Sequence, residues 1–320
     1  MIHLRVRHRR RRFAPVVPIL AVLSLAACGA AGPVASPARS PGCSVVTRAD
    51  VPIEIANGQI ALTASVNERP VRVRVATAVP SPLLLSAEVA AALRLPKIAH
   101  GPLLPGSAQT IEIVGVERLS IGGAPPRRVG AAVVTVPLAA AGQPGDGVVG
   151  WGYLGEFDVE IDPAARRLRL HAVSGCGDDF VPFTEPAFSV PLHMNPAGFP
   201  VVPIRVDGTS CLVALSTGFD TSVVSRAAAL RAGVSEAQLA ADPQVTSTFV
   251  SGARACPAHL FRQIEIGDHV FRDVRLQVLE APPGQGDGAL GADYLLRQRI
   301  WISAATGRVY IARRTVGAGG

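Results

Sequence analysis

The sequence predicts an all-β protein made of two pseudo-symmetric lobes. Two observations carry this prediction: the chain contains an internal repeat, and its apolar residues occur in short runs bounded by turn formers. With 320 residues, the chain is long enough for two domains that each bury a core. Its 32 glycines and 27 prolines are spread along the sequence, which favours short strands joined by turns over long helices.

The internal repeat consists of matching segments that occur in the same order in both halves. A strand–turn–strand pattern occurs twice at an offset of 140 residues, with the turn formers Asn67 and Asp207 at its bends. The matching pairs are residues 65–78 with 205–218, 119–122 with 264–267, 145–150 with 286–291, and 159–170 with 300–311. Several matches in one order indicate a duplication. We therefore expect the two lobes at residues 44–176 and 185–314.

The N-terminal segment has the pattern of an export signal. A basic stretch, residues 1–12, precedes an apolar run that is too short for a stable membrane span. The run ends in Leu-Ala-Ala-Cys at Cys28, which resembles the lipobox of bacterial lipoproteins and implies cleavage before Cys28 and its lipidation. We expect a signal peptide at residues 1–27 and a lipidated flexible tether at residues 28–43. An ordinary signal peptide with an incidental cysteine is the alternative.

The charge distribution gives no basis for nucleic-acid binding. Six of the 31 basic residues lie in residues 5–12, and the other basic residues exceed the 24 acidic ones by one. A near-neutral exported domain has no electrostatic footprint for DNA or RNA. The expected location is the cell envelope, facing the periplasm, with the lipid holding the protein in a membrane. Because Gly29 rather than Asp follows Cys28, the outer membrane is favoured over the inner one.

Besides Cys28, the chain has four cysteines: Cys43, Cys176, Cys211 and Cys256. An even number in an oxidising compartment favours two disulfides. One bridge in each half is the natural pairing, although three connectivities are possible. Metal binding by the Cys-Pro-Ala-His sequence at Cys256 is a weak alternative without partner ligands, so neither a metal nor a cofactor is expected.

The order of features in each half resembles the retropepsin-like aspartic proteases, especially the bacterial two-lobe forms. Residues 215–225 (Leu-Ser-Thr-Gly-Phe-Asp-Thr-Ser-Val-Val-Ser) match the family signature, whose core is hydrophobic-Asp-Thr-Gly, at nearly every position. Residues 289–295 match the distal element of two hydrophobic residues and a glycine, and the resemblance spans about residues 50–312. It implies two acid-protease lobes with an interlobe groove. Because both lobes lie in one chain, we expect a monomer.

The two positions that correspond to the family's catalytic aspartates carry other residues. Ser216 replaces the aspartate in the second lobe, and Ala76 replaces it in the first, where residues 75–78 are Val-Ala-Thr-Ala. Family chemistry needs two carboxylates that share one proton and activate a water molecule. Alanine cannot hold that water, and a serine hydroxyl is too weak a base to deprotonate it. We therefore expect no ordinary aspartic peptidase activity.

Five residues remain as candidates for binding a ligand in the groove: Thr77, Ser216, Thr217, Gly218 and Asp220. The resemblance implies that Asp220 binds the main chain of an extended ligand, with a local turn contact as the alternative. For Ser216 and Thr217 we favour the role of satisfying backbone groups in a tight loop. A nucleophilic Ser216 would need a base and a group that orients it, and no histidine falls in an element expected beside it.

Two matched pairs of residues are expected to be structural. Asp146 and Asp287 lie within Gly-Asp-Gly sequences and are predicted to form turns rather than a further pair of catalytic carboxylates. Trp151 and Trp301 lie in core elements of the repeat and are predicted to pack rather than to bind a ligand.

Three functions are compatible with these observations. We favour a catalytically inactive protease homologue that binds an extended polypeptide or another envelope protein through main-chain hydrogen bonds and side-chain pockets. The alternatives are an active peptidase with a non-standard site and a structural envelope lipoprotein without a ligand. The loop at residues 216–220 favours a retained groove on the second-lobe side, whereas Val-Pro-Ser-Pro at residues 79–82 indicates that the first lobe has drifted.

Overall fold

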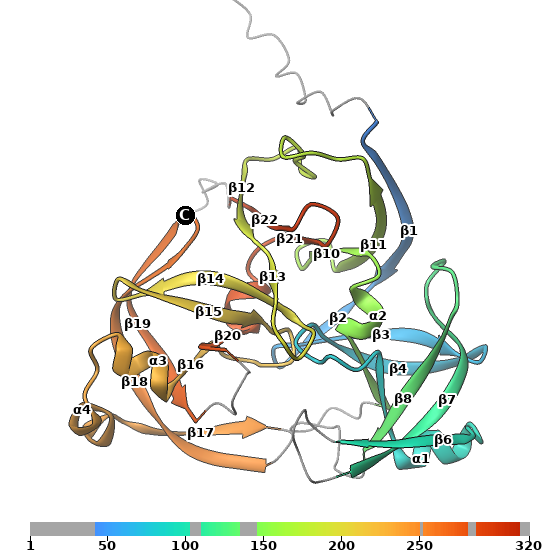
Figure 1. Ribbon diagram of the computed structural model, residues 1–320, viewed down its shortest axis with the longest axis horizontal. Helices are drawn as coiled ribbons and strands as arrows, with labels where there is room; N and C mark the ends of the chain where they lie inside the picture. Colours follow the sequence, from blue (N-terminus) through green and yellow to red (C-terminus); the bar gives the residue numbers. More distant parts are fainter. Residues whose placement is uncertain (1–41, 103–109, 135–145, 250–251, 281–285, 314–320) are drawn as a thin grey trace, which may run out of the picture. The chain divides into compact units, whose positions relative to one another are not determined.

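The computed structural model describes residues 42–102, 110–134, 146–249, 252–280 and 286–313 (Figure 1). Strands make up most of this part of the chain, and its helices are short, so the all-β prediction is confirmed. The predicted signal peptide, Cys28 and nearly all of the tether lie outside the described residues. In the part that is described, no helix is long and apolar enough to cross a membrane.

The first half of the chain forms an eight-stranded sheet with the strand order β2-β3-β4-β9-β5-β8-β7-β6. Its strands are β2 (Glu54–Ala56), β3 (Gln59–Val66), β4 (Arg69–Ala76), β5 (Leu83–Ser86), β6 (Lys97–Pro102), β7 (Thr110–Ile121), β8 (Arg127–Val134) and β9 (Gly147–Gly150). Two short helices follow strands of this sheet: α1 (Ala87–Ala92) after β5 and α2 (Trp151–Leu154) after β9.

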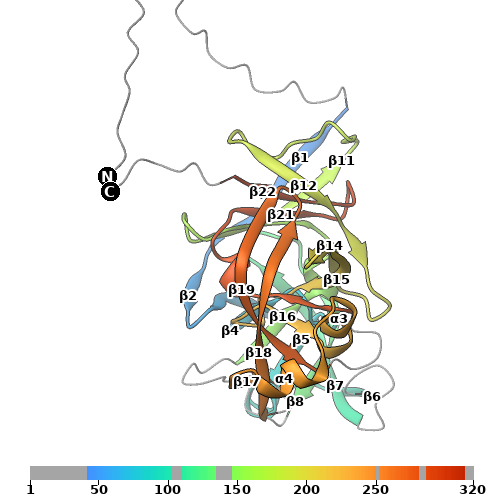
Figure 2. The ribbon, with the colours of Figure 1, turned by 90° about the vertical axis from the view of Figure 1, so that its left-hand side faces the viewer.

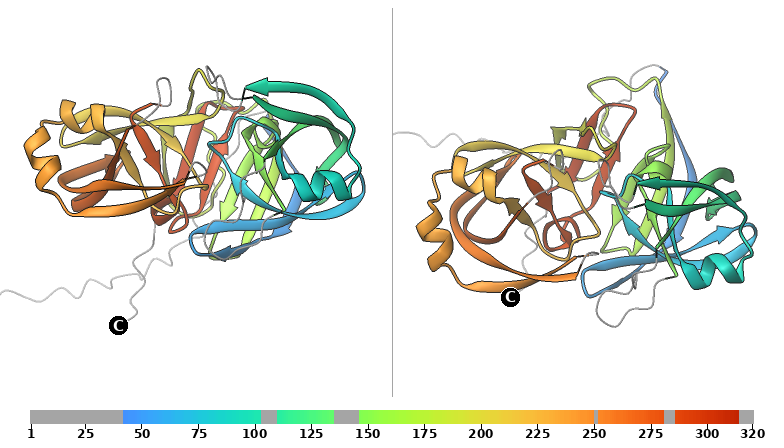
Figure 3. Two further views of the ribbon diagram at one scale, coloured as in Figure 1. Left: turned by 90° about the horizontal axis from the view of Figure 1, so that it is seen from below. Right: turned by 60° about the horizontal axis from the view of Figure 1, so that its bottom comes forward.

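The second half forms an eight-stranded sheet with the corresponding order, β13-β14-β15-β20-β16-β19-β18-β17. Its strands are β13 (His193–Met194), β14 (Pro200–Val206), β15 (Thr209–Leu215), β16 (Val223–Ser225), β17 (Gln244–Phe249), β18 (Gly252–Ile266), β19 (His269–Leu279) and β20 (Gly288–Leu290). Its helices are α3 (Arg226–Arg231), α4 (Glu236–Ala241) and α5 (Ala292–Leu295). In Figure 3 the strands of the two sheets form two separate groups, blue to green and yellow to orange.

The two sheets share the same pattern of parallel and antiparallel pairs, as a duplication requires. β4 and β15 each pair in parallel with a strand from the end of their own half, β9 and β20 respectively. The parallel pair β5–β8 likewise corresponds to β16–β19. The hairpin turns also agree with the sequence: Asn67 and Asp207 have positive φ angles of 48° and 46°. Asparagine and aspartate tolerate this backbone region, which a tight hairpin turn requires.

Matched serines begin the first helix of each half. Ser86 accepts a hydrogen bond from the backbone N–H of Val89 at the start of α1, and Ser225 accepts one from Ala228 at the start of α3. Each serine satisfies a helix N–H that would otherwise lack a partner.

Removing the buried cap of α3 is expected to destabilise the protein modestly. We expect Ser225→Ala to lower the free energy of unfolding by about 1 kcal/mol, because one N–H of the first turn loses its acceptor. Urea denaturation measures the change. Ser210→Ala, at an exposed position of β15, serves as the control and should leave the midpoint unchanged. Equal midpoints for both variants would contradict a stabilising role for the cap.

A six-stranded sheet joins the two halves (Figure 2). Its order is β1-β11-β10-β21-β22-β12, with β1 (Ser44–Pro52), β10 (Asp158–Asp162), β11 (Arg167–Ser174), β12 (Ala187–Pro191), β21 (Ile300–Ser303) and β22 (Arg308–Ala312). The antiparallel pair β10–β21 connects the closing hairpin of the first half to that of the second. The largest hydrophobic core includes residues of both halves, among them Val73 and Leu215. Trp151 and Trp301 are both buried, as predicted.

The cysteines follow the predicted pairing only in part. Cys43 and Cys176 form a disulfide with an S–S distance of 2.06 Å, which joins the beginning of β1 to the segment after β11. The predicted bridge between Cys211 and Cys256 is wrong, because both of these cysteines are free and buried.

Strand pairing keeps these two free cysteines apart. Cys211 lies on β15, and β14 separates β15 from β18, which carries Cys256. β14 pairs with β18 only at Ile264 and Glu265. Cys256 lies eight residues from Ile264 along β18, which is about 26 Å if the strand is extended. A disulfide requires Cα atoms within about 7 Å of each other. The Sγ atoms contact other groups: the carbonyl of Thr209 at 3.7 Å and the side chain of Gln277 at 3.9 Å.

Candidate functional site

The two segments with the signature-like sequences meet at one place, residues 75–78 and 215–218, which we call the seam. β4 ends at Ala76 and β15 ends at Leu215, so each segment lies at the end of a central strand of its own sheet. The parallel partner strands β9 and β20 hold these strand ends in register. The duplication therefore brings two equivalent chain segments together.

Thr77 and Thr217 join the two halves of the seam through reciprocal hydrogen bonds. The N–H of Thr77 donates to Oγ1 of Thr217 at 3.2 Å, and the N–H of Thr217 donates to Oγ1 of Thr77 at 3.2 Å. Each hydroxyl then donates across the seam: that of Thr217 to the carbonyl of Val75 at 2.7 Å, and that of Thr77 to the carbonyl of Leu215. Both threonines are 0% exposed, so these bonds satisfy groups that have no access to water.

Ala76 and Ser216 flank a common point next to these threonines. A Cβ atom placed on Gly218 would lie 3.3 Å from the Cβ of Ala76 and 3.8 Å from the Oγ of Ser216. Ala76 is 6% exposed and Ser216 is 2% exposed. The N–H of Ser216 donates to the carbonyl of Leu290 in β20 at 3.0 Å, which fixes the loop to the sheet.

No base is placed to activate Ser216. In the described part of the chain, no histidine or carboxylate is hydrogen-bonded to its Oγ. Three of the five histidines beyond the signal segment contact groups elsewhere: His171 contacts Glu160 and Thr47, His259 contacts Asp242, and His269 contacts Tyr294. A serine hydroxyl without an adjacent base is a poor nucleophile, so this arrangement does not favour covalent catalysis.

Gly218 and Asp220 lie against a turn of the first lobe. The side chain of Gln59 donates a hydrogen bond to the carbonyl of Gly218 at 3.3 Å. A Cβ on Gly58, whose φ is 70°, would lie 3.2 Å from the Cβ of Asp220. The carbonyl of Asp220 accepts from the N–H of Asp293 at 3.1 Å, which ties this loop to α5.

The carboxylate of Asp220 is accessible to a ligand. Its residue is exposed, and the hydroxyl of Thr221 donates to its Oδ1 at 3.4 Å. This contact belongs to the local turn, so it leaves the other carboxylate oxygen free to accept a hydrogen bond.

Asp146 and Asp287 have the structural role that their matched positions predict. Oδ2 of Asp146 accepts from the N–H of Arg72 at 3.3 Å, and Oδ2 of Asp287 accepts from the N–H of Leu212 at 2.9 Å. Each aspartate also donates its own N–H to the carbonyl of the same residue. The two carboxylates therefore fix equivalent turns in the two sheets. No set of three or more His, Cys, Asp or Glu side chains in the described segments could hold a metal ion.

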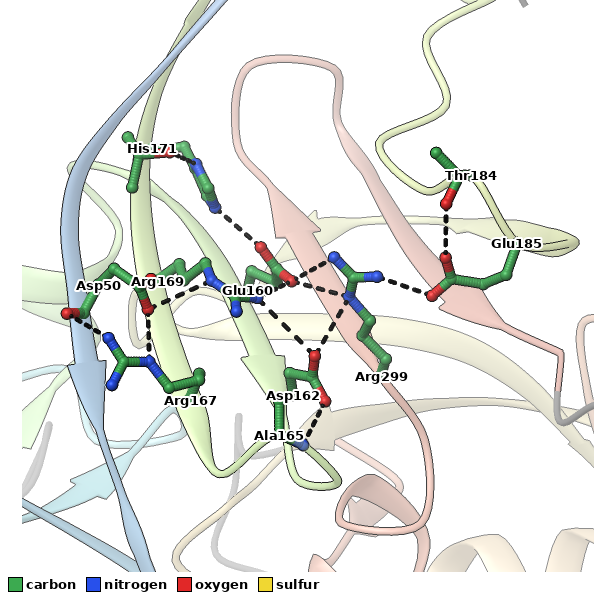
Figure 4. Close-up of polar contacts among 11 residues, drawn as sticks. Asp50, Glu160, Asp162, Ala165, Arg167, Arg169, His171, Thr184, Glu185 and Arg299 are labelled. Carbon is green, nitrogen blue, oxygen red and sulfur yellow. Dashed lines mark hydrogen bonds and ion pairs between the residues drawn. The ribbon is translucent and has the colours of Figure 1, made fainter. Parts of the chain in front are cut away.

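A buried charge network, which the sequence pattern does not predict, lies in the six-stranded sheet (Figure 4). Glu160 on β10 is 2% exposed and lies between Arg169 and Arg299. Its Oε1 accepts hydrogen bonds from Nη1 of Arg169 at 2.7 Å and from Nε of Arg299 at 2.8 Å. Its Oε2 contacts Nε2 of His171 at 3.1 Å. Arg299 also donates to Glu185 at 2.8 Å.

The electrostatics of Glu160 indicate a structural role. Burial raises its pKa, but hydrogen bonds from His171 and Arg299 and the charges of Arg299 and Arg169 outweigh this effect and lower the pKa to about 2. A carboxylate with such a low pKa is a poor proton acceptor near neutral pH. The only sequence indication of this network is that Glu160 and Arg299 both lie in or beside the repeated closing hairpins.

Comparison with known proteins gives matches to aspartic proteases. Residues 202–294 match the family described as aspartyl protease. No curated protein sequence matches the chain. Among solved structures, a retropepsin-like aspartic protease from Rickettsia conorii is 17% identical, covers 41% of this chain and 94% of its own, and has a TM-score of 0.29. Basic 7S globulin from soybean is 14% identical over 82% of this chain and 94% of its own, with a TM-score of 0.44. An aspartic proteinase from Irpex lacteus is 12% identical over 84% and 97%, with a TM-score of 0.46.

Proposed function

We propose that this chain, whose residues 202–294 match an aspartyl protease family, is a catalytically inactive homologue that binds an extended polypeptide between its two lobes. The observation that carries the proposal is the seam. The reciprocal hydrogen bonds of Thr77 and Thr217 hold the two signature segments together, while Ala76 and Ser216 stand at the positions of the two carboxylates. The framework of the site is kept and its acid–base groups are replaced.

The chemistry of the replaced positions supports inactivity. Peptide hydrolysis by this family requires one ionised carboxylate to accept a proton from water and one protonated carboxyl to donate a proton to the substrate. Ala76 can do neither, and Ser216 has no base among the described residues. Loss of a single general acid–base group lowers a rate by about 10²–10⁴, and here both are absent.

The exposed carboxylate of Asp220 supports peptide binding. An extended polypeptide presents main-chain N–H groups at regular intervals, and a carboxylate accepts such hydrogen bonds strongly. Asp220 lies on the loop that follows Ser216 and is held in place by contacts with Asp293 and with the first-lobe turn at Gly58. The main chain of Asp220 is therefore fixed by these contacts, while its carboxylate is exposed and can bind a ligand.

We further propose that the protein acts as a monomer of the cell envelope, anchored through a lipid on Cys28. The basic and apolar N-terminal segments ending in Leu-Ala-Ala-Cys support export and lipidation. The disulfide between Cys43 and Cys176 is consistent with an oxidising compartment. Because both equivalent seam segments are supplied by one chain, no second copy is needed to complete the site.

Peptide retention without cleavage is the expected behaviour of the purified full-length protein in detergent. The immobilised protein is incubated with a randomised octapeptide library from pH 3 to pH 8, and mass spectrometry identifies retained peptides and new termini. We expect retained intact peptides and no new termini. Asp220→Asn should lower retention about tenfold, because a charge-assisted hydrogen bond is lost.

The matched control is Asp273→Asn, which makes the same change at an exposed carboxylate of β19 and should not alter retention. Cleavage that survives in Asp220→Asn but disappears in Ser216→Ala would contradict inactivity and make Ser216 part of an active site. Absence of any retained peptide would contradict peptide binding and favour a structural role in the envelope.

A further inference from the structure

Arg74 lies on the same sheet face as Ala76, two residues before it on β4. Side chains alternate along a strand, and the regular register of β4 with β9 continues through Ala76. Val73 and Val75 therefore point into the main core, while Arg74 and Ala76 share the opposite face. The β9 residue paired with Arg74 is Val148, which packs with Ala76 in a small apolar cluster. The guanidinium thus extends from an apolar surface beside the seam.

Among the described residues, this arginine has no counter-charge. Its Nε is buried without a hydrogen-bond partner, and no ion pair among the described residues includes it. All 24 acidic side chains of the chain fall within the described segments, so no Asp or Glu elsewhere in the sequence can neutralise it. Arg72, on the same face of the same strand, instead forms an ion pair with Glu54. Burial lowers the pKa of Arg74, but an arginine remains charged at physiological pH.

The fold does not need a charge at this position. In the repeat, Ala214 of the second lobe corresponds to Arg74 of the first lobe. Ala214 lies two positions before Ser216, and Arg74 lies two positions before Ala76. Ala214 is buried in its lobe and completes the same strand pairing. A partly buried charge without a partner is unfavourable, because desolvation is not offset by an ionic contact. A residue that destabilises the free protein and is not required by the fold is typical of a binding site.

We propose that Arg74 binds a carboxylate of the ligand, so that the polypeptide recognised beside the seam is acidic. This inference rests on the proposed function and names the chemical class of its ligand. The guanidinium fork matches a carboxylate in two parallel hydrogen bonds, and the apolar surroundings of Val148 and Ala76 strengthen such a contact by excluding water. An Asp or Glu side chain or the C-terminal carboxylate of a peptide supplies the required group.

A first experiment tests the unpaired charge without any peptide. Thermal unfolding of the full-length protein, Arg74→Met and the control Arg72→Met is compared in sodium chloride and in sodium acetate at equal ionic strength. We expect Arg74→Met to unfold at a higher temperature than the wild type in chloride, because an unpaired charge is removed. Acetate should raise the unfolding temperature of the wild type and of Arg72→Met more than that of Arg74→Met. A lower unfolding temperature of Arg74→Met in chloride would overturn the inference and make Arg74 a structural residue.

A second experiment tests acidic recognition with the randomised octapeptide library. Peptides retained by the wild type and by Arg72→Met should be enriched about tenfold in Asp or Glu at one position, and Arg74→Met should lose this enrichment. Arg74→Lys should keep part of it, since lysine has the charge without the fork. Retained peptides without acidic enrichment would overturn the inference and leave the proposed function standing. If acetate raises the unfolding temperature only in the proteins that contain Arg74, but no peptide is retained, Arg74 binds a carboxylate and the proposed peptide binding is contradicted.

Discussion

Glu160→Gln is expected to lower the free energy of unfolding by about 3 kcal/mol at neutral pH. The substitution keeps the size of the side chain and imitates the protonated carboxyl, which the surroundings of Glu160 disfavour. A pKa lowered from 4.5 to about 2 corresponds to about this difference between the two protonation states. The group is 2% exposed, so solvent screens the interaction little. The effect is large because Glu160 joins β10 to Arg299, which directly precedes β21, at the strand pair that connects the two halves.

Urea denaturation at pH 7 measures this change, with Glu117→Gln as the matched control. Glu117 forms an ion pair with Arg128, but both side chains are more than half exposed, and exposed pairs contribute little to stability. We expect the control to shift the free energy of unfolding by less than about 0.5 kcal/mol. Equal effects of the two substitutions would mean that the buried network does not stabilise the junction.

The difference between wild type and Glu160→Gln is also expected to depend on pH. The folded-state pKa is lowered, so the stabilisation by ionised Glu160 is fully present above about pH 4.5 and is lost as the pH falls towards 2. The wild type should therefore lose its advantage over the variant across this window. Urea denaturation of both proteins between pH 2 and pH 7 tests this. The difference between their free energies of unfolding at each pH removes the contributions of other carboxylates, such as Asp50, that both proteins share. A constant difference across the window would contradict the lowered pKa.

The sequence predicted those parts of the fold that depend on local pattern and on repetition. Turn formers at Asn67 and Asp207 predict hairpins because short-range hydrogen bonding determines these turns. Once the duplication was recognised, Thr77 and Thr217 were known to be equivalent. Their equivalence did not reveal that each hydroxyl reaches a carbonyl of the other lobe, because this contact depends on how the two lobes are placed.

The features that the sequence did not predict depend on contacts between distant segments. The closing hairpins were assigned to separate lobes, but in the structure they share one sheet, which brings Glu160 to Arg299 across 139 residues. The proposed bridge between Cys211 and Cys256 rested on an even cysteine count, which carries no information on the strand order that separates them. The sequence pattern does not distinguish Arg74 either, because its lack of an ionic partner depends on where the acidic side chains of distant segments lie.

Thr77→Val and Thr217→Val are each expected to lower the free energy of unfolding by about 2–4 kcal/mol. Valine has nearly the shape of threonine, so packing is preserved while the hydroxyl is removed. Each substitution leaves one N–H and one carbonyl of the opposite lobe buried without a partner, and each unsatisfied group costs about 1–3 kcal/mol. Because the two threonines make the same bonds in opposite directions, the two variants should be destabilised to a similar extent.

Urea denaturation of the two valine variants, with Thr77→Ser and Thr217→Ser as controls, tests whether the seam holds the lobes together as a symmetric unit. Serine keeps the hydroxyl, so each serine variant should recover most of the lost stability. Peptide retention supplies a separate readout, because a loosened seam should weaken binding even where Asp220 and Arg74 are unchanged. If only one valine variant is destabilised, the two halves of the seam do not contribute equally, and the lobe that tolerates the loss is held by other contacts. If neither is destabilised, the reciprocal hydrogen bonds are not what joins the lobes, and the β10–β21 pair with its charge network carries that role alone.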